Sequence, residues 1–487
     1  MGASISVTES QLLTDCYYKS MKKNPDASLE IPEPIAAVGE RIAGAGGEAY
    51  IVGGWLRDRL RGVECNDIDL ATSLTPDRVR NAVEELGPVY NLGERFGTVG
   101  VRAGECTVEI TTFRRDRYSP GSRHPEVTPV ASIGEDLSRR DFTINAMALQ
   151  VAPEPGRLLD PFGGARDIER CLIRTPGLPG ERMAEDPLRM MRAVRFAAQL
   201  GYEIDGELLG VLKGDTGLLD SISWERRRDE LERILVTDGA DTGIRTLVDT
   251  GLMRSVSPEL AAMDGVEQPT RYHRADVLEH TLLTMMYLPA DPLLRRAALF
   301  HDVGKPPAKV TSPRISFHDH ESIGEELTRR SMRRLRYGNI DIRETAFLVR
   351  RHMRPILYDS AWTDAAVRRM RRECTLVKDD TVLVPVETLF ELAAADIKAG
   401  SLEKAGEGLA RLSELKERVD RAGEEHPVEM SRSPLDGGEL MELFGREQGP
   451  WIRDVKAHLT GLVVDGELAP HDKDEAARRA RLFIEDD

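Results

Sequence analysis

Hydrophobic and polar positions divide the chain into two differently patterned parts. Between residue 49 and about residue 150, short apolar and β-branched runs are interrupted by glycine. Runs of this kind predict β-strands; they are AYIVGG, DIDLAT, GTVGVR, CTVEITTF and INAMALQ. Helices are expected among them at 55–60 and 75–86, the second with Thr75 as N-cap and Pro76 as first helical residue. The pattern predicts a compact domain of mixed sheet and helices.

After Pro176 the spacing of Leu, Ala and Met becomes helical almost to the C-terminus, and strand signals are few. The predicted fold class is therefore α+β, a small mixed head followed by a long all-α region. Pro/Gly-rich stretches and shifts in composition suggest the boundaries. The expected parts are an N-terminal leader at 1–33, the head at 34–175, a helical neck at 176–270, a second helical domain at 271–400 and a helical tail at 401–487.

Composition narrows the class of protein. The 487 residues are 40% hydrophobic and 31% charged, which is typical of a globular protein. A net charge of −16 argues against a uniformly basic nucleic-acid binder but not against a local basic groove. The five cysteines form no C-x-x-C pair, so a disulfide framework or thiolate zinc site is not expected. No apolar run reaches 18 residues and no signal peptide is visible, so we expect a cytoplasmic protein without a membrane partner.

A glycine pair marks the first candidate site. In IVGGWLRDRLRG, Gly53 and Gly54 stand between a predicted strand and a predicted helix, and Arg57 follows one turn later. Glycine lets a ligand approach the backbone, free N–H groups at a helix start attract anions, and a guanidinium binds phosphate. The segment therefore indicates a triphosphate site. Simple turn geometry is the alternative.

Two acids follow on the next predicted strand. Asp67 and Asp69 are two residues apart and are expected to share one face of that strand. Paired carboxylates suit Mg²⁺, which commonly adds substrate phosphates to its ligands. The alternative is a solvated strand edge. Glu109 is a further candidate carboxylate, although a single Glu on a strand is more often solvated.

A third constellation lies in EDPLRMMRAVRF. Its charged members recur every three residues on a predicted helix and are Asp186, Arg189, Arg192 and Arg195. A carboxylate beside a guanidinium pairs with the amino donor and ring-nitrogen acceptor that cytosine and adenine share. It mispairs with guanine and uracil, whose donor and acceptor are reversed. An ordinary amphipathic helix, with Met190, Met191, Val194 and Phe196 on its buried side, is the alternative.

Histidines are concentrated in the second helical region. Five of the ten fall between 280 and 352. With two aspartates they form the ordered series His280, His301–Asp302, His320, His352 and Asp396, whereas His318 is interpreted as a neighbouring or surface group. Imidazoles and carboxylates on packed helices can hold one or two transition metals and activate water. The alternative is a helical domain in which the same residues are only structural.

These segments together resemble the class II tRNA nucleotidyltransferases and bacterial poly(A) polymerases, within the polymerase-β-like nucleotidyltransferase superfamily. The similarity covers about 34–465 and is closest to actinobacterial CCA-adding enzymes that carry an HD domain. The segments that carry it are GGWLRD, DIDLAT, VEITTFR, EDLSRRDFTINAMAL, LLDPFGG, AEDPLRMMRAVRFAAQLGY, the histidine series and PLDGGELMELFG.

The resemblance implies specific roles. Asp67 and Asp69 would hold two Mg²⁺ ions, and Arg140 of SRRD would bind the triphosphate. Asp186 and Arg189 would act as a protein template for CTP and ATP, while Arg192 and Arg195 would steady the phosphates or the geometry. The segment 113–127 matches a flexible loop that helps switch from C to A addition. The histidine series matches HD phosphohydrolases with a metal such as Mn²⁺ or Ni²⁺.

The implied activity is addition of C, C and A to the 3′ end of tRNA without a nucleic-acid template. Arginine-rich stretches at 226–228, 329–354 and 368–372 would contact the RNA. The nearest alternatives are a poly(A) polymerase or a partial CC- or A-adding enzyme. Two further alternatives are an HD phosphohydrolase with an RNA-binding head and a non-catalytic RNA-binding protein.

Overall fold

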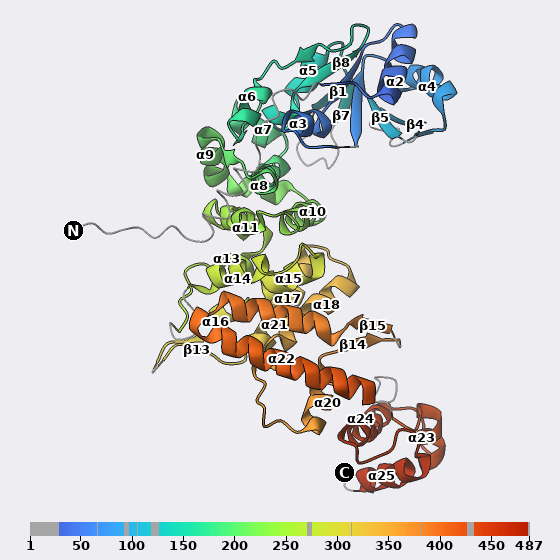
Figure 1. The fold of residues 1–487 in the computed structure, drawn as a ribbon, viewed down its shortest axis with the longest axis vertical. Coiled ribbons are helices and arrows are strands. Elements are labelled where there is room, and N and C mark those ends of the chain that lie inside the picture. The colour runs from blue at the N-terminus through green and yellow to red at the C-terminus, as the bar shows by residue number, and fades with distance from the viewer. Residues whose placement is uncertain are drawn as a thin grey trace, which may run out of the picture. The chain divides into compact units, whose positions relative to one another are not determined.

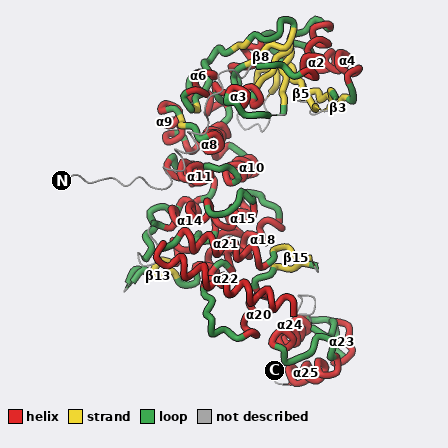
Figure 2. The backbone as a smooth tube through the Cα atoms, viewed as in Figure 1, coloured by secondary structure: helices red, strands yellow, loops and turns green. Residues whose placement is uncertain are grey.

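The computed structural model describes residues 29–65, 67–91, 97–104, 106–117, 126–269, 275–312, 314–379, 381–425 and 433–485. The chain forms two compact units, Met1–Ser223 and Trp224–Asp487, which are described separately. Figures 1 and 2 show the path of the chain through each unit. Most of the leader expected at 1–33, and residues 118–125 of the expected flexible loop, lie outside the described residues.

The first unit is built on a seven-stranded sheet of order β3-β4-β5-β2-β1-β8-β9. Strands β2 and β5 run parallel, and the other neighbouring pairs are antiparallel. The parallel register pairs Asp69 with Glu109. The strands are β1 (Ala49–Val52), β2 (Ile68–Thr72), β3 (Val89–Asn91), β4 (Thr98–Ala103), β5 (Cys106–Thr112), β8 (Ala148–Ala152) and β9 (Leu158–Leu159).

Helices cover this sheet and continue beyond it. Helix α2 packs on β8, α4 packs on β4 and β5, and α3 packs on β1 and β2. Short pairs β6 (Arg114–Arg117) with β7 (Glu126–Pro129) and β10 (Leu172–Ile173) with β11 (Glu203–Ile204) complete the unit. The helices are α2 (Glu33–Gly44), α3 (Gly54–Leu60), α4 (Pro76–Val83), η1 (Glu84–Leu86), α5 (Ile133–Ser138), η3 (Thr143–Asn145), α6 (Gly164–Glu169), α7 (Pro179–Glu185), α8 (Leu188–Leu200), α9 (Gly206–Gly214) and η4 (Thr216–Ser221).

In the described residues of the second unit the strands form two short hairpins, β12 (Lys309–Val310) with β13 (Ser316–Phe317) and β14 (Leu376–Lys378) with β15 (Thr381–Val384), and the other elements are helices. Its central helices pack in the pairs α17 with α18, α14 with α21 and α15 with α18. The helices are α10 (Trp224–Leu235), α11 (Ala240–Asp249), α12 (Leu252–Val256), α13 (Pro258–Ala261), α14 (Val277–Met286), α15 (Pro292–Phe300), α16 (Lys305–Ala308), α17 (His320–Arg334), α18 (Asn339–Arg351), α19 (Met353–Ile356), α20 (Asp364–Glu373), α21 (Val386–Ala399), α22 (Leu402–Glu425), α23 (Gly437–Phe444), α24 (Pro450–Asp465) and α25 (Lys473–Glu485).

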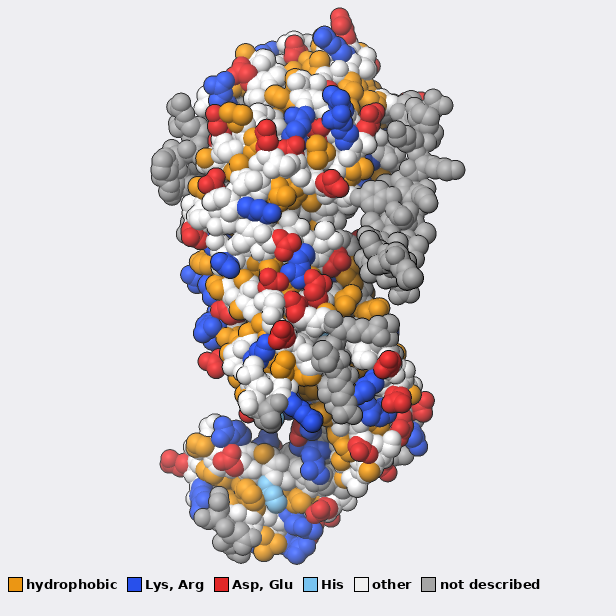
Figure 3. All heavy atoms as spheres, turned by 90° about the vertical axis from the view of Figure 1, so that its left-hand side faces the viewer, with side chains coloured by type: hydrophobic (Ala, Val, Ile, Leu, Met, Phe, Trp, Pro, Cys, Tyr) orange, Lys and Arg blue, Asp and Glu red, His pale blue; other side chains and the backbone are white. Residues whose placement is uncertain are grey.

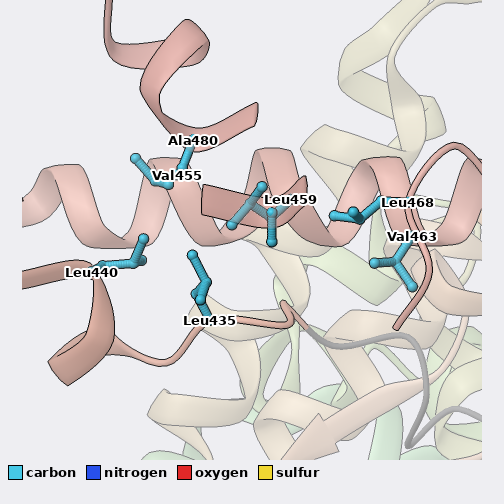
Figure 4. Packing of buried hydrophobic residues seen from close by; sticks show 8 residues of the cluster. Leu435, Leu440, Val455, Leu459, Val463, Leu468 and Ala480 are labelled. Carbon is cyan, nitrogen blue, oxygen red and sulfur yellow. The ribbon is translucent and has the colours of Figure 1, made fainter. Parts of the chain in front are cut away.

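The last three helices share a small core of their own. Leu440 of α23 and Leu459 of α24 are fully buried, as is Ala480 of α25 (Figure 4). Asp436 and Glu439 form a capping box at the start of α23, which satisfies N–H groups that the helix itself cannot. The segment PLDGGELMELFG is therefore a capped helix start that is anchored by apolar residues.

The predicted fold class is confirmed, with a mixed-sheet head followed by a helical remainder. One predicted strand is partly wrong. INAMALQ was expected to be a strand throughout, but residues 143–145 form a 3-10 turn and β8 begins at Ala148. The side chain of Thr143 donates to Asp167 and that of Asn145 donates to Asp141, which favours the turn. Within the described ranges, no helix is both long and apolar enough to cross a membrane.

Candidate nucleotide and metal sites

The turn between β1 and α3 brings a carboxylate and a guanidinium together. Gly53 has φ of +78°, which favours glycine. A Cβ at this position would lie 3.4 Å from Nη1 of Arg140 and 3.5 Å from Oδ2 of Asp69. Because Gly53 has no side chain, the space beside the guanidinium of Arg140 and the carboxylate of Asp69 is not filled. The sequence prediction placed all three in one site, and the structure brings them together.

Asp69 belongs to a cluster of acids at the end of this turn. Asp69 lies on β2 at a position that is open to solvent, although surrounding atoms partly desolvate its carboxyl group, with Glu109 beside it on β5 and Asp67 just before the strand. Burial, then Asp67 and then Glu109 raise the pKa of Asp69 to about 6, and Arg140 only partly opposes them. Arg140 therefore does not fully offset the negative charge of Asp67, Asp69 and Glu109. A divalent cation would offset the remainder because hard cations prefer carboxylate oxygens.

A buried acid holds the arginines of SRRD. Asp136 is 1% exposed and accepts hydrogen bonds from Arg139 (Nε, 3.0 Å; Nη2, 2.8 Å) and Arg140 (Nη2, 3.2 Å). Burial would raise the pKa of Asp136, but Arg140 and Arg139 hold it below its usual value. The carboxylate therefore stays ionised and fixes Arg140 beside Asp69. In the sequence, Asp136 stands four residues before Arg140, a separation at which an acid and an arginine on a helix can pair. This spacing could have identified Asp136 as the residue that holds Arg140.

Asp186 and Arg189 lie at the junction of α7 and α8, and both are less than one-tenth exposed. Oδ1 of Asp186 accepts a hydrogen bond from the backbone N–H of Leu188 at 3.2 Å. Arg189 donates to Oε2 of Glu185 at 3.0 Å and to the carbonyl of Arg139 at 2.6 Å. Since Arg139 and Arg140 are both held by Asp136, these contacts connect the pair to the acid cluster. Glu185 was not among the predicted residues.

A second network holds Arg57 and Arg192. Nη1 of Arg57 donates to Oδ1 of Asn145 at 3.0 Å, and Asn145 donates to Asp141 at 3.0 Å. Arg192 donates to the other oxygen of Asp141, with 3.0 Å from Nε. Although burial opposes ionisation, Arg192 and Asn145 lower the pKa of Asp141 to about 2. Arg195 donates to Gln199 at 3.0 Å, so the structure ties each of the predicted arginines on α3 and α8 to an identified partner.

The histidine series converges in the second unit. His280 on α14 and Asp396 on α21 are 2.9 Å apart, and His320 and His352 are 3.3 Å apart between their Nε2 atoms. Two groups each have their ligand atoms within 4.8 Å of one another. They are His280, His301 and Asp396, and Asp302, His320 and His352. The structure therefore brings all six predicted residues together.

Asp302 belongs to the second group but also lies beside His301 of the first group, and it is 1% exposed. Its Oδ2 is 3.2 Å from Nε2 of His301, and its Oδ1 is 3.7 Å from Nε2 of His320. Burial opposes its ionisation, but His301 and Lys305 lower the pKa of Asp302 well below the usual value. Lys305 donates to Asp302 at 2.6 Å and to Gln268 at 2.7 Å. Asp302 can therefore offer one carboxylate oxygen to each group.

The backbone fixes which histidine nitrogen faces the cluster. Nδ1 of His301, His320 and His352 lies 2.7, 2.9 and 2.7 Å from the carbonyls of residues three positions earlier. A carbonyl oxygen accepts a hydrogen bond from Nδ1–H, so each Nε2 offers a lone pair to the cluster. Lone pairs on His320 and His352 that face each other at 3.3 Å favour an intervening cation. These donors suit a transition metal.

Gly304 explains why the cluster is so close-packed. A Cβ at this position would meet the backbone carbonyl oxygen of His320 at 2.0 Å and the backbone nitrogen of Gly324 at 2.6 Å. Glycine therefore allows the chain after His301–Asp302 to lie directly against α17. In sequence terms, HDVGK contains the ligands, this glycine and Lys305, of which only the ligands were predicted.

The arginine-rich stretches are partly engaged within the protein. Arg334 and Arg330 pair with Glu259, and Arg329 pairs with Glu325. Arg227 is 2% exposed and lies over the ring of Trp224 at 4.2 Å. On the face shown in Figure 3, cationic and anionic side chains are interspersed. Part of the arginine content in these stretches therefore stabilises the helices rather than forming a separate basic surface.

Comparison with known families matches three parts of the chain. Residues 49–174 match the family described as "Poly A polymerase head domain". Residues 201–264 match "Probable RNA and SrmB- binding site of polymerase A", and residues 272–379 match "HD domain". The first match contains the acid cluster and the last contains His280 through His352.

Curated relatives extend these matches. An A-adding tRNA nucleotidyltransferase of Deinococcus radiodurans is 34% identical over 90% of this chain and 95% of that enzyme. A CCA-adding enzyme of Bacillus velezensis is 43% identical over 46% of this chain and 54% of that enzyme. Among solved structures, the CCA-adding enzyme of Bacillus stearothermophilus in complex with CTP aligns with a TM-score of 0.64 and 26% identity, over 94% of this chain and all of that one.

Proposed function

Because the chain belongs to the family of tRNA nucleotidyltransferases that includes the A-adding and CCA-adding enzymes, we propose that it rebuilds the 3′-CCA end of tRNA. The substrates are tRNA, CTP and ATP, and pyrophosphate is released. The 3′-hydroxyl of the RNA attacks the α-phosphate of the nucleotide. Addition needs no nucleic-acid template because side chains of the protein select the base.

The observation that carries this proposal is the cluster of carboxylates around Asp69, whose negative charge Arg140 only partly offsets. The cluster lies beside the space that Gly53 leaves free. These residues fit Mg²⁺, with Asp67 and Asp69 as its ligands. Bound Mg²⁺ would stabilise the charge that develops on the attacking and leaving oxygens. Arg140, held by Asp136, would bind the triphosphate, and Arg57 would support it from the start of α3. Gly53 and Gly54 let the phosphates approach the backbone.

Asp186 and Arg189 select the base in this proposal. The carboxylate accepts a hydrogen bond from the exocyclic amino group of cytosine or adenine, and the guanidinium donates to the neighbouring ring nitrogen. Uracil and guanine present the opposite pattern and leave buried groups unpaired. Arg192 and Arg195, which follow this pair along α8, steady the triphosphate.

Incubation with tRNA substrates tests the proposal. One tRNA lacks CCA and another lacks only the terminal A, and each is incubated with labelled CTP, labelled ATP or both. We expect two C residues and one A on the first substrate and a single A on the second. Addition of A alone to both, or of long A tails, would contradict CCA addition and support an A-adding enzyme or a poly(A) polymerase.

A second activity is favoured by the two ligand groups and by Asp302, which directs one carboxylate oxygen toward His301 and the other toward His320. We also propose that His280, His301, Asp302, His320, His352 and Asp396 hold transition metals such as Mn²⁺ or Ni²⁺. Bound metal would activate water for attack on a phosphate ester. Lys305 offsets the charge of Asp302, and the backbone carbonyls hold the histidine rings in position. The substrate class is a phosphomonoester or a cyclic phosphodiester.

Metal content and hydrolysis can be measured together. We expect about two ions per chain in the wild type and about one in His320→Ala, because this change removes a ligand from one group only. Asp302→Ala should retain neither ion and should hydrolyse a 2′,3′-cyclic nucleotide on the order of a hundredfold more slowly. His318→Ala, an exposed neighbour, is the matched control. Unchanged metal content in Asp302→Ala would contradict the shared-ligand arrangement.

The remaining features stay predictions. They are the cytoplasmic location, the particular similarity to actinobacterial CCA-adding enzymes, and the domain boundaries. The predicted domains are 1–33, 34–175, 176–270, 271–400 and 401–487. Proteolysis of the full chain in the presence of tRNA would test the boundaries, because linkers between folded domains are cleaved first.

A further inference from the structure

One aromatic ring on α8 contacts three of the arginines around the candidate nucleotide site. The guanidinium carbons of Arg195, Arg57 and Arg192 lie 4.1, 5.4 and 5.5 Å from the centroid of the Phe196 ring. Phe196 is 6% exposed, and its ring meets Phe142 edge-on at 5.6 Å. The pattern of the sequence predicts only an apolar residue on the buried side of the helix.

These contacts have a physical consequence for the three cations. Guanidinium groups that share a small space repel one another. Hydrogen bonds from Arg57 to Asp58 and from Arg192 to Asp141 offset part of this repulsion. The negative face of an aromatic ring attracts cations within about 6 Å and offsets this repulsion. An aliphatic side chain of similar size offers no such attraction.

The arginines come from different elements that the ring connects. Arg57 lies on α3, immediately after the glycine turn, whereas Arg192 and Arg195 lie on α8 with the base-selecting pair. Phe142 follows Asp141 directly and so links the ring to the Asp141–Asn145 network. The ring of Phe196 therefore lies between Arg57, which follows the glycine turn of the proposed triphosphate site, and the helix that carries the base-selecting Arg189.

We infer that Phe196 is a positioning residue that sets the arginine cluster for the triphosphate of the incoming nucleotide. This inference rests on the proposed function of the first unit. CTP and ATP carry the same triphosphate, so the role of Phe196 is independent of the base. It is thereby distinct from the role of Asp186 and Arg189, which act on the base alone.

Steady-state kinetics with Phe196→Leu and Phe196→Tyr test the inference. In Phe196→Leu, KM for CTP and for ATP should rise by the same factor of about 10, which corresponds to about 1.4 kcal/mol. Turnover at saturation should change by less than about threefold, and discrimination against UTP should not change. Phe196→Tyr keeps the ring and should restore KM. Val194→Ala, a fully buried change on the same helix, controls for packing and should leave KM within about twofold.

Titration of the full-length protein with CTP and Mg²⁺ separates this inference from the proposed activity. If the wild type binds CTP but adds no CCA, the proposed function fails, whereas a tenfold weaker Kd in Phe196→Leu would still support the inference. If the wild type adds CCA and Phe196→Leu matches it in KM and Kd, the inference is overturned and the activity stands. Equal KM increases in Phe196→Leu and Val194→Ala would also overturn it, because packing alone would then account for the effect.

Discussion

Asp69→Asn is expected to abolish nucleotide addition and at the same time to stabilise the metal-free protein. Loss of one carboxylate removes a ligand for Mg²⁺, so we expect kcat to fall on the order of a thousandfold, or about 4 kcal/mol. The stabilising effect follows from the pKa of Asp69, which burial, Asp67 and Glu109 raise from 3.8 to about 6. Ionised Asp69 therefore costs the folded state free energy.

The sign of this effect depends on pH. Well below pH 3.8, Asp69 is protonated in the folded and unfolded states alike, and the substitution should not change stability. As pH rises from about 4 to 6, the unfolded state releases the proton first and the wild type loses stability. Because Asp69 is open to solvent, which screens the surrounding charges, we expect this loss to be only about 1 kcal/mol. In the presence of EDTA at pH 7.5, Asp69→Asn should raise the Tm by about 2 °C.

A surface acid provides the control. Glu154→Gln changes charge equally but lies at an exposed position and should alter neither activity nor Tm. An Asp69→Asn protein that keeps a substantial part of its activity would exclude Asp69 as a metal ligand. An inactive variant with lowered Tm at pH 7.5 would instead indicate that Asp69 supports the fold.

The second large effect concerns choice of the base. Asp186→Asn should reduce kcat/KM for both CTP and ATP on the order of a hundredfold, because a hydrogen bond to a charged group is lost or misaligned at the transition state. The kcat/KM for UTP should not fall by the same factor, so the ratio of kcat/KM for CTP to that for UTP should decrease. The comparison of CTP, ATP and UTP under one condition measures this directly.

Asparagine is preferred to alanine here for a structural reason. Asp186 accepts a hydrogen bond from the N–H of Leu188 near the start of α8, and an amide oxygen can replace it. Asp186→Ala should lower the Tm as well, since loss of such a contact costs about 1 kcal/mol. Glu181→Ala, an exposed acid on α7, is the matched control. Equal losses for CTP, ATP and UTP in Asp186→Asn would mean that Asp186 does not read the base.

The spacing of apolar residues was enough to predict a mixed-sheet head followed by a helical remainder, because strands and helices each have their own local repeat of buried positions. It failed at residues 143–145, where the side chains of Thr143 and Asn145 bond to Asp167 and Asp141. Those partners lie at separations of 24 and 4 residues, and the former contact depends on the tertiary fold. A strand pattern cannot reveal such competition.

The residues that the structure brings together in the candidate sites were predictable because the proposed chemistry restricts the residue type, as with Asp69 or His301. The residues that hold them were less visible. In the sequence, Asp136 and Glu185 look like ordinary helix acids and Lys305 like a surface cation. Only the fold places them beside Arg140, Arg189 and Asp302. Phe196 fits any apolar pattern, and only the structure shows that Arg57 reaches it from a separate helix.

The most direct test of the account is a crystal structure of this protein with CTP and Mg²⁺. We expect metal density bridging the carboxylates of Asp67 and Asp69 to the triphosphate. We also expect the Watson–Crick edge of cytosine within hydrogen-bond distance of Asp186 and Arg189. CTP bound with no metal at these aspartates, or with its base directed away from Asp186 and Arg189, would contradict the account.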